Sequence, residues 1–239
     1  MSRPPNTTQA ELLLLHALPL DGSMWAAQMA LLPGRTYAPT LYGAGEDLQD
    51  WAQAALQHIS GDQIIVVGCS IGGSCALQVA ARAPGRVAAL VLIGTKAEHR
   101  PDPAFHQSAT DLLQTNGLEA AWNTYWRPLV SSATRPQAIS EIKEMTMRQS
   151  LAGIVGGVNV FHTRPSRTDI LESFDGPVHI ITGADDPTPG IEVAKAQAAQ
   201  ARHGHLHIIP DCGHYVPMEQ PEKLNAILRD VTKTVEGCA

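Results

Sequence analysis

The chain has 239 residues, of which 44% are hydrophobic and 17% are charged, and these proportions are typical of a compact globular protein. Its formal net charge is −6, from 17 lysines and arginines against 23 aspartates and glutamates, with no basic cluster. Because this balance provides no surface for a nucleic-acid backbone or an anionic membrane, we expect a small-molecule partner.

The start of the chain, MSRPPNTTQAE, lacks the apolar core of a secretory signal, and no window reaches the roughly 18 apolar residues that span a bilayer. We therefore expect a cytoplasmic protein, with a disordered tail up to Gln9. The cysteines show no CxxC spacing, and a chain of this length needs no disulfide to hold its core. Reduced thiols are expected at Cys69, Cys75, Cys212 and Cys238.

Apolar runs with strand character alternate with helical stretches along most of the chain. The expected strands are Glu11–His16, Arg35–Thr40, Gln63–Gly68, Val87–Ile93, Val178–Thr182 and Leu206–Ile209. The expected helices are Leu48–His58, Ile71–Arg82, Ile191–His203 and Pro221–Val235. Most of the strand runs are continuously apolar, as in strands that are buried on both faces. The alternation predicts a mostly parallel sheet covered by helices, an α/β fold.

The segment 96–174 breaks this alternation, because helical patterns follow one another there without a strand-like run. Asn116-Gly117 and Arg135-Pro136 interrupt it. We expect this segment to be a helical cap inserted into a core made of residues 1–95 and 175–239. Its aromatic residues either pack within the cap or line a substrate site; they are Trp122, Tyr125, Trp126 and Phe161.

The stretch VVGCSIGGSC, residues 66–75, places Ser70 where a strand-like run gives way to a helix. A serine in so sharp a turn needs a strained backbone, and Gly68 and Gly72 relieve the crowding on either side. Such a turn exposes the hydroxyl beside the N–H groups that open the following helix, which can meet an oxyanion. The pattern predicts a nucleophile elbow; the alternative is a glycine-rich turn without chemistry.

A serine hydroxyl needs a base to activate it, and the base needs an acid to orient it. In CGHYVPMEQPEKL, His214 follows the last expected strand and is expected at the same sheet edge as Ser70. No other histidine has this context, and no histidine pair has the spacing and acidic partner of a zinc site. The acid is expected in HIITGADDPTP, where Asp185 and Asp186 both fit.

These motifs, in the order Ser, Asp, His, together with LLLLHALPLDGSMW near the start, resemble the alpha/beta-hydrolase superfamily over essentially the whole chain. The resemblance implies an alpha/beta-hydrolase fold and a triad of Ser70, Asp186 and His214. It favours Asp186 over Asp185 because the family's acid loop usually reads Gly-x-x-Asp-Pro, although the loop here is one residue shorter before its second proline.

The resemblance also implies an oxyanion hole. In relatives, a His-Gly-x-Pro turn after the first buried strand supplies one backbone N–H to it. Here the turn reads HALP, so the N–H of Leu18 is implied in that role, opposite the N–H of Ile71. Ala17 replaces the usual glycine, a change that would be costly if the site needed a positive φ. His16 is expected to hold the turn rather than to act as a base.

The function implied by the resemblance is hydrolysis of a small carboxylic ester or lactone through an acyl-enzyme, without a metal or cofactor. A serine at position 70 argues against dehalogenases and epoxide hydrolases, which use aspartate there. Carbon–carbon bond hydrolases, thioesterases, perhydrolases and a menaquinone-pathway lyase share the same three residues. A small-molecule receptor on this scaffold is a further alternative. The PLDGSMW stretch is most similar to 3-oxoadipate enol-lactonases and related small-ester hydrolases.

Overall fold

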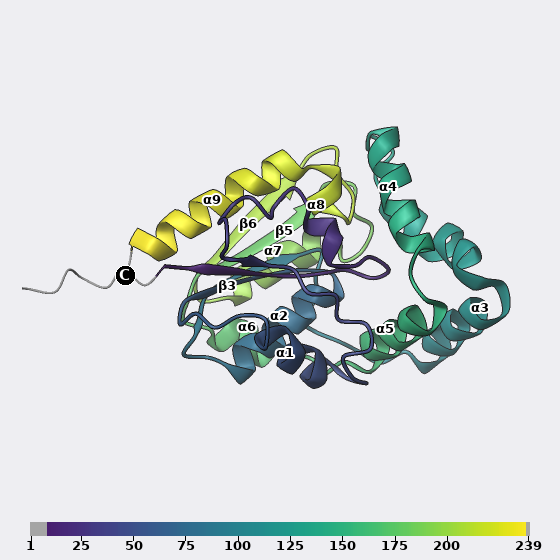
Figure 1. The fold of residues 1–239 in the computed structure, drawn as a ribbon, viewed down its shortest axis with the longest axis horizontal. Coiled ribbons are helices and arrows are strands. Elements are labelled where there is room, and N and C mark those ends of the chain that lie inside the picture. The colour runs from purple at the N-terminus through teal and green to yellow at the C-terminus, as the bar shows by residue number, and fades with distance from the viewer. Residues whose placement is uncertain (1–8, 238–239) are drawn as a thin grey trace, which may run out of the picture.

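The computed structural model describes residues 9–237 and centres on one six-stranded sheet (Figure 1). All pairings are parallel, in the order β2-β1-β3-β4-β5-β6. The strands are β1 (Glu11–Leu15), β2 (Thr36–Tyr37), β3 (Ile64–Cys69), β4 (Val87–Ile93), β5 (Val178–Gly183) and β6 (Gly204–Ile209). The expected disordered tail, apart from Gln9, and Cys238 lie outside the described residues.

The centre of the sheet is apolar on both faces. β3 is buried at every position, and Leu14, Val67 and Val91 are register partners across β1, β3 and β4. Helices cover both faces of a parallel sheet, so its central strands contain continuous Leu, Ile and Val rather than an alternating pattern. These strands therefore form the rigid centre on which the loops at their ends depend.

The edge strands differ from the expected ones. The run Arg35–Thr40 contributes only Thr36–Tyr37 to the ladder, because Pro39 has no N–H to donate and β2 lies at an edge of the sheet. At the opposite edge, β6 begins at Gly204, two residues before the expected start at Leu206. There the polar residues His205 and His207 interrupt the apolar run, so the start of the strand was not expected from the sequence.

The helices lie on the two faces of the sheet. On one face lie α1 (Leu48–Leu56), α2 (Ile71–Arg82), α6 (Thr168–Ser173) and α7 (Gly190–Gln200). On the other face lie the short η1 (Gly22–Trp25), α8 (Val216–Glu219) and the long α9 (Pro221–Gly237), as Figure 1 shows. This arrangement follows from right-handed crossovers between parallel strands, which place successive helices on the same face.

Between β4 and β5 the chain is helical, and none of its described residues there lies in a strand. The elements are α3 (Pro103–Ala121), the π-helical η2 (Trp122–Trp126), η3 (Arg127–Leu129), α4 (Pro136–Met147), α5 (Leu151–Thr163) and α6. α3, α4 and α5 extend beyond the carboxyl ends of the strands (Figure 1). α6 packs against α2 and α7 instead. Gly117, in the expected break, has a non-helical φ of 75° and kinks α3.

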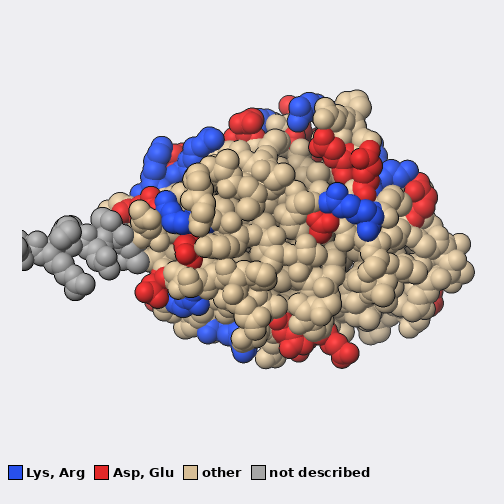
Figure 2. All heavy atoms as spheres, in the orientation of Figure 1, with Lys and Arg blue, Asp and Glu red and all other residues tan. Residues whose placement is uncertain are grey.

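Charged side chains of both signs lie mostly around the margin of the face drawn in Figure 2, whose centre is largely uncharged, and no large patch has one sign. Of the helices within residues 9–237, none combines the length and apolarity that a membrane-crossing segment needs.

The fold brings four loops to one edge. β1, β3, β5 and β6 run in the same direction, so the loops that follow them leave the sheet on the same side. These loops carry the four residues singled out from the sequence, Leu18, Ser70, Asp186 and His214. The helices that connect β4 to β5 lie at the same edge of the sheet (Figure 1). Ligand sites of open α/β sheets form at this edge.

Candidate active site

Ser70 lies at a strained turn between β3 and α2. Its φ of 56° and ψ of −120° are unusual for a residue with a side chain, and Asp211 is the only other non-glycine residue with positive φ in the described chain. The Ser70 N–H donates a hydrogen bond to the carbonyl of Ile93, at 2.8 Å. This bond to the end of β4 fixes the strained turn and leaves the Ser70 side chain partly exposed.

The glycines beside Ser70 are needed for close backbone contact. A Cβ at Gly68 would lie 2.2 Å from the carbonyl oxygen of Gly72. A Cβ at Gly72 would lie 2.2 Å from the carbonyl oxygen of Leu15, at the end of β1. Both clashes are with backbone atoms, which cannot rotate away, so the spacing seen in the sequence has a direct steric cause.

His214 and Asp186 form a buried pair next to this turn. The imidazole Nδ1 lies 2.9 Å from Asp186 Oδ2, and the exposed fractions of the two side chains are 4% and 0%. The other carboxylate oxygen, Oδ1, accepts the backbone N–H of Thr188 at 2.9 Å. We assign the Nδ1–H tautomer from these partners, because an ionised carboxylate only accepts hydrogen bonds. Nε2 of His214 is then left as a proton acceptor.

The neighbouring aspartate points elsewhere. Asp185 is exposed, its Oδ2 accepts the hydroxyl of Ser131 at 2.5 Å, and its backbone N–H donates to Cys212. The structure thus places Asp186, and not Asp185, against the imidazole, although the two were equivalent by residue type.

Two backbone N–H groups near Ser70 have no acceptor within the described chain. They belong to Leu18, after β1, and to Ile71, at the first position of α2. The Tyr215 hydroxyl, next to His214 in the chain, donates to the Leu18 carbonyl at 3.1 Å and so holds the peptide that follows the Leu18 N–H. Ala17 is not among the residues with positive φ, so alanine can replace glycine there without strain.

His16 is part of the scaffold of this turn. Its Nε2 accepts the N–H of Leu41 at 2.9 Å, and its Nδ1 lies 3.2 Å from the carbonyl of Ala17. Burial lowers the pKa of His16 to about 4, so the ring is neutral at pH 7. The imidazole is occupied on both sides and holds the HALP turn in place.

The cysteines near the site are poor nucleophiles. Cys69, Cys75 and Cys212 are buried and not in disulfides. Burial raises the pKa of each thiol, so little thiolate is present at neutral pH. Within residues 9–237, no cluster of three or more His, Cys, Asp or Glu side chains is arranged to hold a metal ion.

A cavity of about 1180 Å³ opens above these groups. Ser70, His214 and Leu18 line it from the sheet edge, and the helices between β4 and β5 line it from the opposite side. Three of the four aromatic residues singled out from the sequence lie in its wall: Tyr125, Trp126 and Phe161. Trp122 is buried and is not one of the residues that line the cavity, so it packs within the helical segment between β4 and β5 instead.

Glu219 was not predicted, and it organises the histidine loop. This buried carboxylate accepts the N–H groups of Gly213 and Tyr215, the residues on either side of His214, at 2.9 and 2.8 Å. It also accepts the N–H of Ser131 at 3.0 Å and the hydroxyl of Thr134. Four donors on one carboxylate hold the His214 loop against the segment before α4. The sequence signal for this role was an acidic residue at the end of the otherwise apolar VPME turn, five positions after His214.

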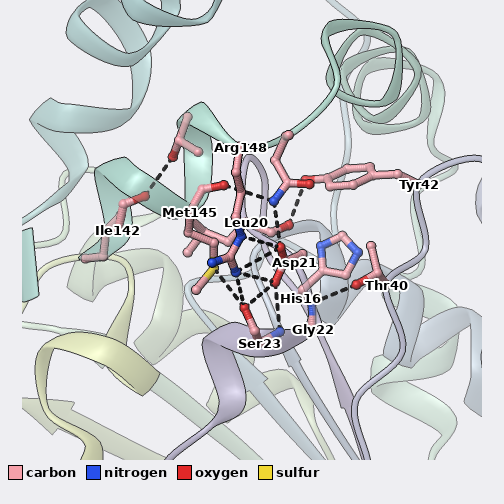
Figure 3. A network of polar contacts seen from close by, with 12 residues as sticks. His16, Leu20, Asp21, Gly22, Ser23, Thr40, Tyr42, Ile142, Met145 and Arg148 are labelled. Atoms are coloured by element: carbon pink, nitrogen blue, oxygen red, sulfur yellow. Dashed lines mark hydrogen bonds and ion pairs between the residues drawn. The ribbon is translucent and has the colours of Figure 1, made fainter. Parts of the chain in front are cut away.

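Asp21 was also missed, and it performs a similar task for the Leu18 loop (Figure 3). Its Oδ1 accepts the N–H of Ser23 at 2.9 Å and starts η1. Its Oδ2 lies 3.1 Å from Nη2 of Arg148 and 2.6 Å from Nε2 of Gln149, both just past the end of α4. Burial raises the pKa of Asp21, but hydrogen bonds from Ser23, Gln149 and Arg148 outweigh it, and the pKa is lower than usual.

Known proteins are similar to this chain in sequence and in architecture. A profile of the alpha/beta hydrolase family matches residues 12–227. The pimeloyl-[acyl-carrier protein] methyl ester esterase of Aromatoleum aromaticum is 28% identical, over 93% of this chain and 98% of its own. The putative 2-succinyl-6-hydroxy-2,4-cyclohexadiene-1-carboxylate synthase of Bacillus subtilis is 26% identical, over 97% and 93%. A thermophilic esterase from Thermogutta terrifontis superposes with a TM-score of 0.86 at 27% identity, over 95% and 90%.

We expect Glu219→Gln to lower the free energy of unfolding by about 2 kcal/mol, because an amide would place a donor against backbone N–H groups. If the site hydrolyses esters, kcat should fall about 10- to 100-fold as His214 loses its position. Urea unfolding and initial rates measure the two effects. The matched control is Glu222→Gln, an exposed residue in the first turn of α9. Wild-type values for both quantities in Glu219→Gln would contradict the positioning role.

For Asp21→Asn we expect a loss of about 1 kcal/mol in the free energy of unfolding at pH 7, from weaker bonds to Arg148 and Gln149. Because the folded pKa of Asp21 is lowered, its carboxylate stabilises the protein above about pH 4. That contribution disappears as the pH falls through the folded pKa. The difference from wild type, measured by urea unfolding between pH 7 and 3, should therefore shrink. The control is the same substitution at an exposed position, Asp62→Asn. A difference between Asp21→Asn and wild type that stays constant with pH would show that the charge of Asp21 is irrelevant.

Proposed function

The chain belongs to the alpha/beta hydrolase family, and we propose that it hydrolyses a small carboxylic ester or lactone with Ser70, His214 and Asp186 as its catalytic residues. The observation that carries this proposal is the buried 2.9 Å bond between His214 and Asp186, because the His214 of this pair lines the same cavity as the strained Ser70. The esterases among the relatives support hydrolase activity.

The proposed reaction proceeds in two halves. His214 Nε2 takes the proton of Ser70 Oγ as the oxygen attacks the carbonyl carbon, and the carbonyl π electrons move onto oxygen. The N–H groups of Leu18 and Ile71 stabilise that oxyanion. As it collapses, the bond to the leaving oxygen breaks, His214 returns the proton to that oxygen, and an acyl-enzyme remains.

Water then completes the cycle. His214 takes a proton from water while the oxygen attacks the acyl carbon, and the second oxyanion occupies the same N–H groups. Collapse of this intermediate releases the carboxylic acid, and the proton returns to Ser70. Asp186 keeps the imidazole in the Nδ1–H tautomer throughout and stabilises the imidazolium.

The helices over the sheet edge supply the substrate-selecting part of this proposal. We assign residues 96–174 to a cap and the rest of the described chain, residues 9–95 and 175–237, to the hydrolase core. Tyr125, Trp126 and Phe161 give the cap an aromatic wall on the cavity that holds Ser70. α6 lies inside the assigned cap range but packs on the core helices α2 and α7, so the aromatic wall depends on the elements before it.

We expect a fluorophosphonate probe to label Ser70, as peptide mass spectrometry can establish, and Ser70→Ala to abolish turnover of p-nitrophenyl esters. Neither Cys69 nor Cys75, the buried cysteines that neighbour Ser70 in the chain, is expected to carry the adduct. The control is Ser74→Ala, one turn further along α2. A label elsewhere, or full activity in Ser70→Ala, would overturn the assignment. Labelling without turnover of esters, lactones or thioesters would favour a receptor on this scaffold.

The choice between the two aspartates is testable by a matched pair of variants. Asp186→Asn should lower kcat by roughly 10⁴-fold, because the imidazole loses its tautomer and the partner of its charged form. Asp185→Asn removes only the charge of an exposed carboxylate that accepts the Ser131 hydroxyl, and it should leave kcat within about twofold. Initial rates on one ester suffice, and the reverse ranking would assign the role to Asp185.

A further inference from the structure

Arg164 is a buried cation without an anionic partner in the wall of the cavity. It follows the last residue of α5, and only 7% of its surface is exposed. No carboxylate of the described residues forms an ion pair with it. Burial lowers the pKa of Arg164 to about 10, so the side chain stays charged at neutral pH. Burying a charge that has no counter-charge destabilises the folded protein, so this arrangement needs a reason.

The neighbours of Arg164 satisfy one side of the guanidinium. Nη1 donates to the carbonyl of Phe161, and the guanidinium carbon lies 3.9 Å from the centre of the Phe161 ring. Nε is buried and has no hydrogen-bond partner, and no bond from Nη2 is found within residues 9–237. The unoccupied Nε–Nη2 edge carries two parallel N–H donors, which is the geometry that binds a planar carboxylate.

The charges around Arg164 do not neutralise it. Burial, followed by the charge of Arg164, lowers the pKa of His99, and the same causes with His106 lower the pKa of His162 to about 4. Both imidazole rings are therefore neutral at pH 7, and neither can supply the negative charge that would pair with Arg164. The acidic residues in the cavity lining are exposed, and Glu98 and Glu192 pair with their own cations, Arg100 and Lys195.

We infer that the substrate of this site carries a carboxylate in addition to its scissile ester, and that Arg164 binds this carboxylate. The inference rests on the proposed hydrolase function and specifies its substrate class. The ester carbonyl lies at Ser70, and the second carboxylate lies against the wall formed by the end of α5. Ser70 and Arg164 both line the cavity of about 1180 Å³, so one substrate in this cavity can reach both groups. Arg164 acts in binding and takes no part in proton transfer.

The test compares hemiesters with neutral esters. The probes are monomethyl esters of dicarboxylic acids from succinate to pimelate, and methyl esters of monocarboxylic acids of equal chain length. Wild type should prefer the hemiester by at least about tenfold in kcat/KM at the best length. Arg164→Met should remove that preference through KM while keeping turnover of the neutral esters. Arg164→Lys should retain part of it, and the exposed control Arg202→Met should retain all of it.

A binding measurement separates this inference from the proposed function. Free dicarboxylates should raise the Tm of Ser70→Ala and fail to raise that of the Ser70→Ala, Arg164→Met double variant. If this holds but no ester is cleaved, the anion site stands and the hydrolase proposal fails. If neutral esters are cleaved without any preference for hemiesters or binding of dicarboxylates by wild type, only the anion site is wrong. Equal loss on both ester series in Arg164→Met, with dicarboxylate binding retained, would also overturn it.

Discussion

The close backbone approach at the Ser70 turn is the constraint on which the candidate site depends. β1, β3 and the start of α2 approach one another so closely there that a Cβ atom at position 68 or 72 would clash with backbone atoms, and only glycine fits. The bond from Ser70 N–H to Ile93 ties the same turn to β4. Three central strands thus hold one strained residue, and the apolar packing of the sheet offsets the cost of that strain. The strain is what exposes the hydroxyl.

Two buried or half-buried carboxylates connect the sheet edge to the helices above it. Glu219 binds the His214 loop and the segment before α4 through backbone donors, and Asp21 binds the Leu18 loop to the end of α4 through Arg148 and Gln149. Both carboxylates lie outside the three proposed catalytic residues. The geometry of the site is therefore set jointly by the core and the inserted helices, so α4 can influence groups that it does not touch.

Arg164 gives the opposite wall of the cavity a different character. Aromatic residues of this wall, such as Phe161, would suit an uncharged ligand, but the unoccupied donor edge of Arg164 selects for an anion. A site of this kind rejects uncharged analogues because they leave the guanidinium unpaired. Selectivity would then come from the helices and reactivity from the sheet edge, two parts of the chain with separate packing requirements.

The sequence by itself determined the parallel sheet, the helical segment between β4 and β5, and the candidate residues Ser70 and His214, because continuous apolar runs and a glycine-flanked serine have local physical causes. It did not determine the ends of β2 and β6, since Pro39 and the histidines of β6 act through edge position. Residue type alone did not separate Asp185 from Asp186; the family resemblance favoured Asp186, and the tertiary structure places Asp186 against the imidazole. Only the tertiary structure revealed the contacts of Glu219, Asp21 and Arg164. Hydrogen bonds between residues far apart in the chain, and the burial of a charge, depend on how the elements pack, which no local pattern records.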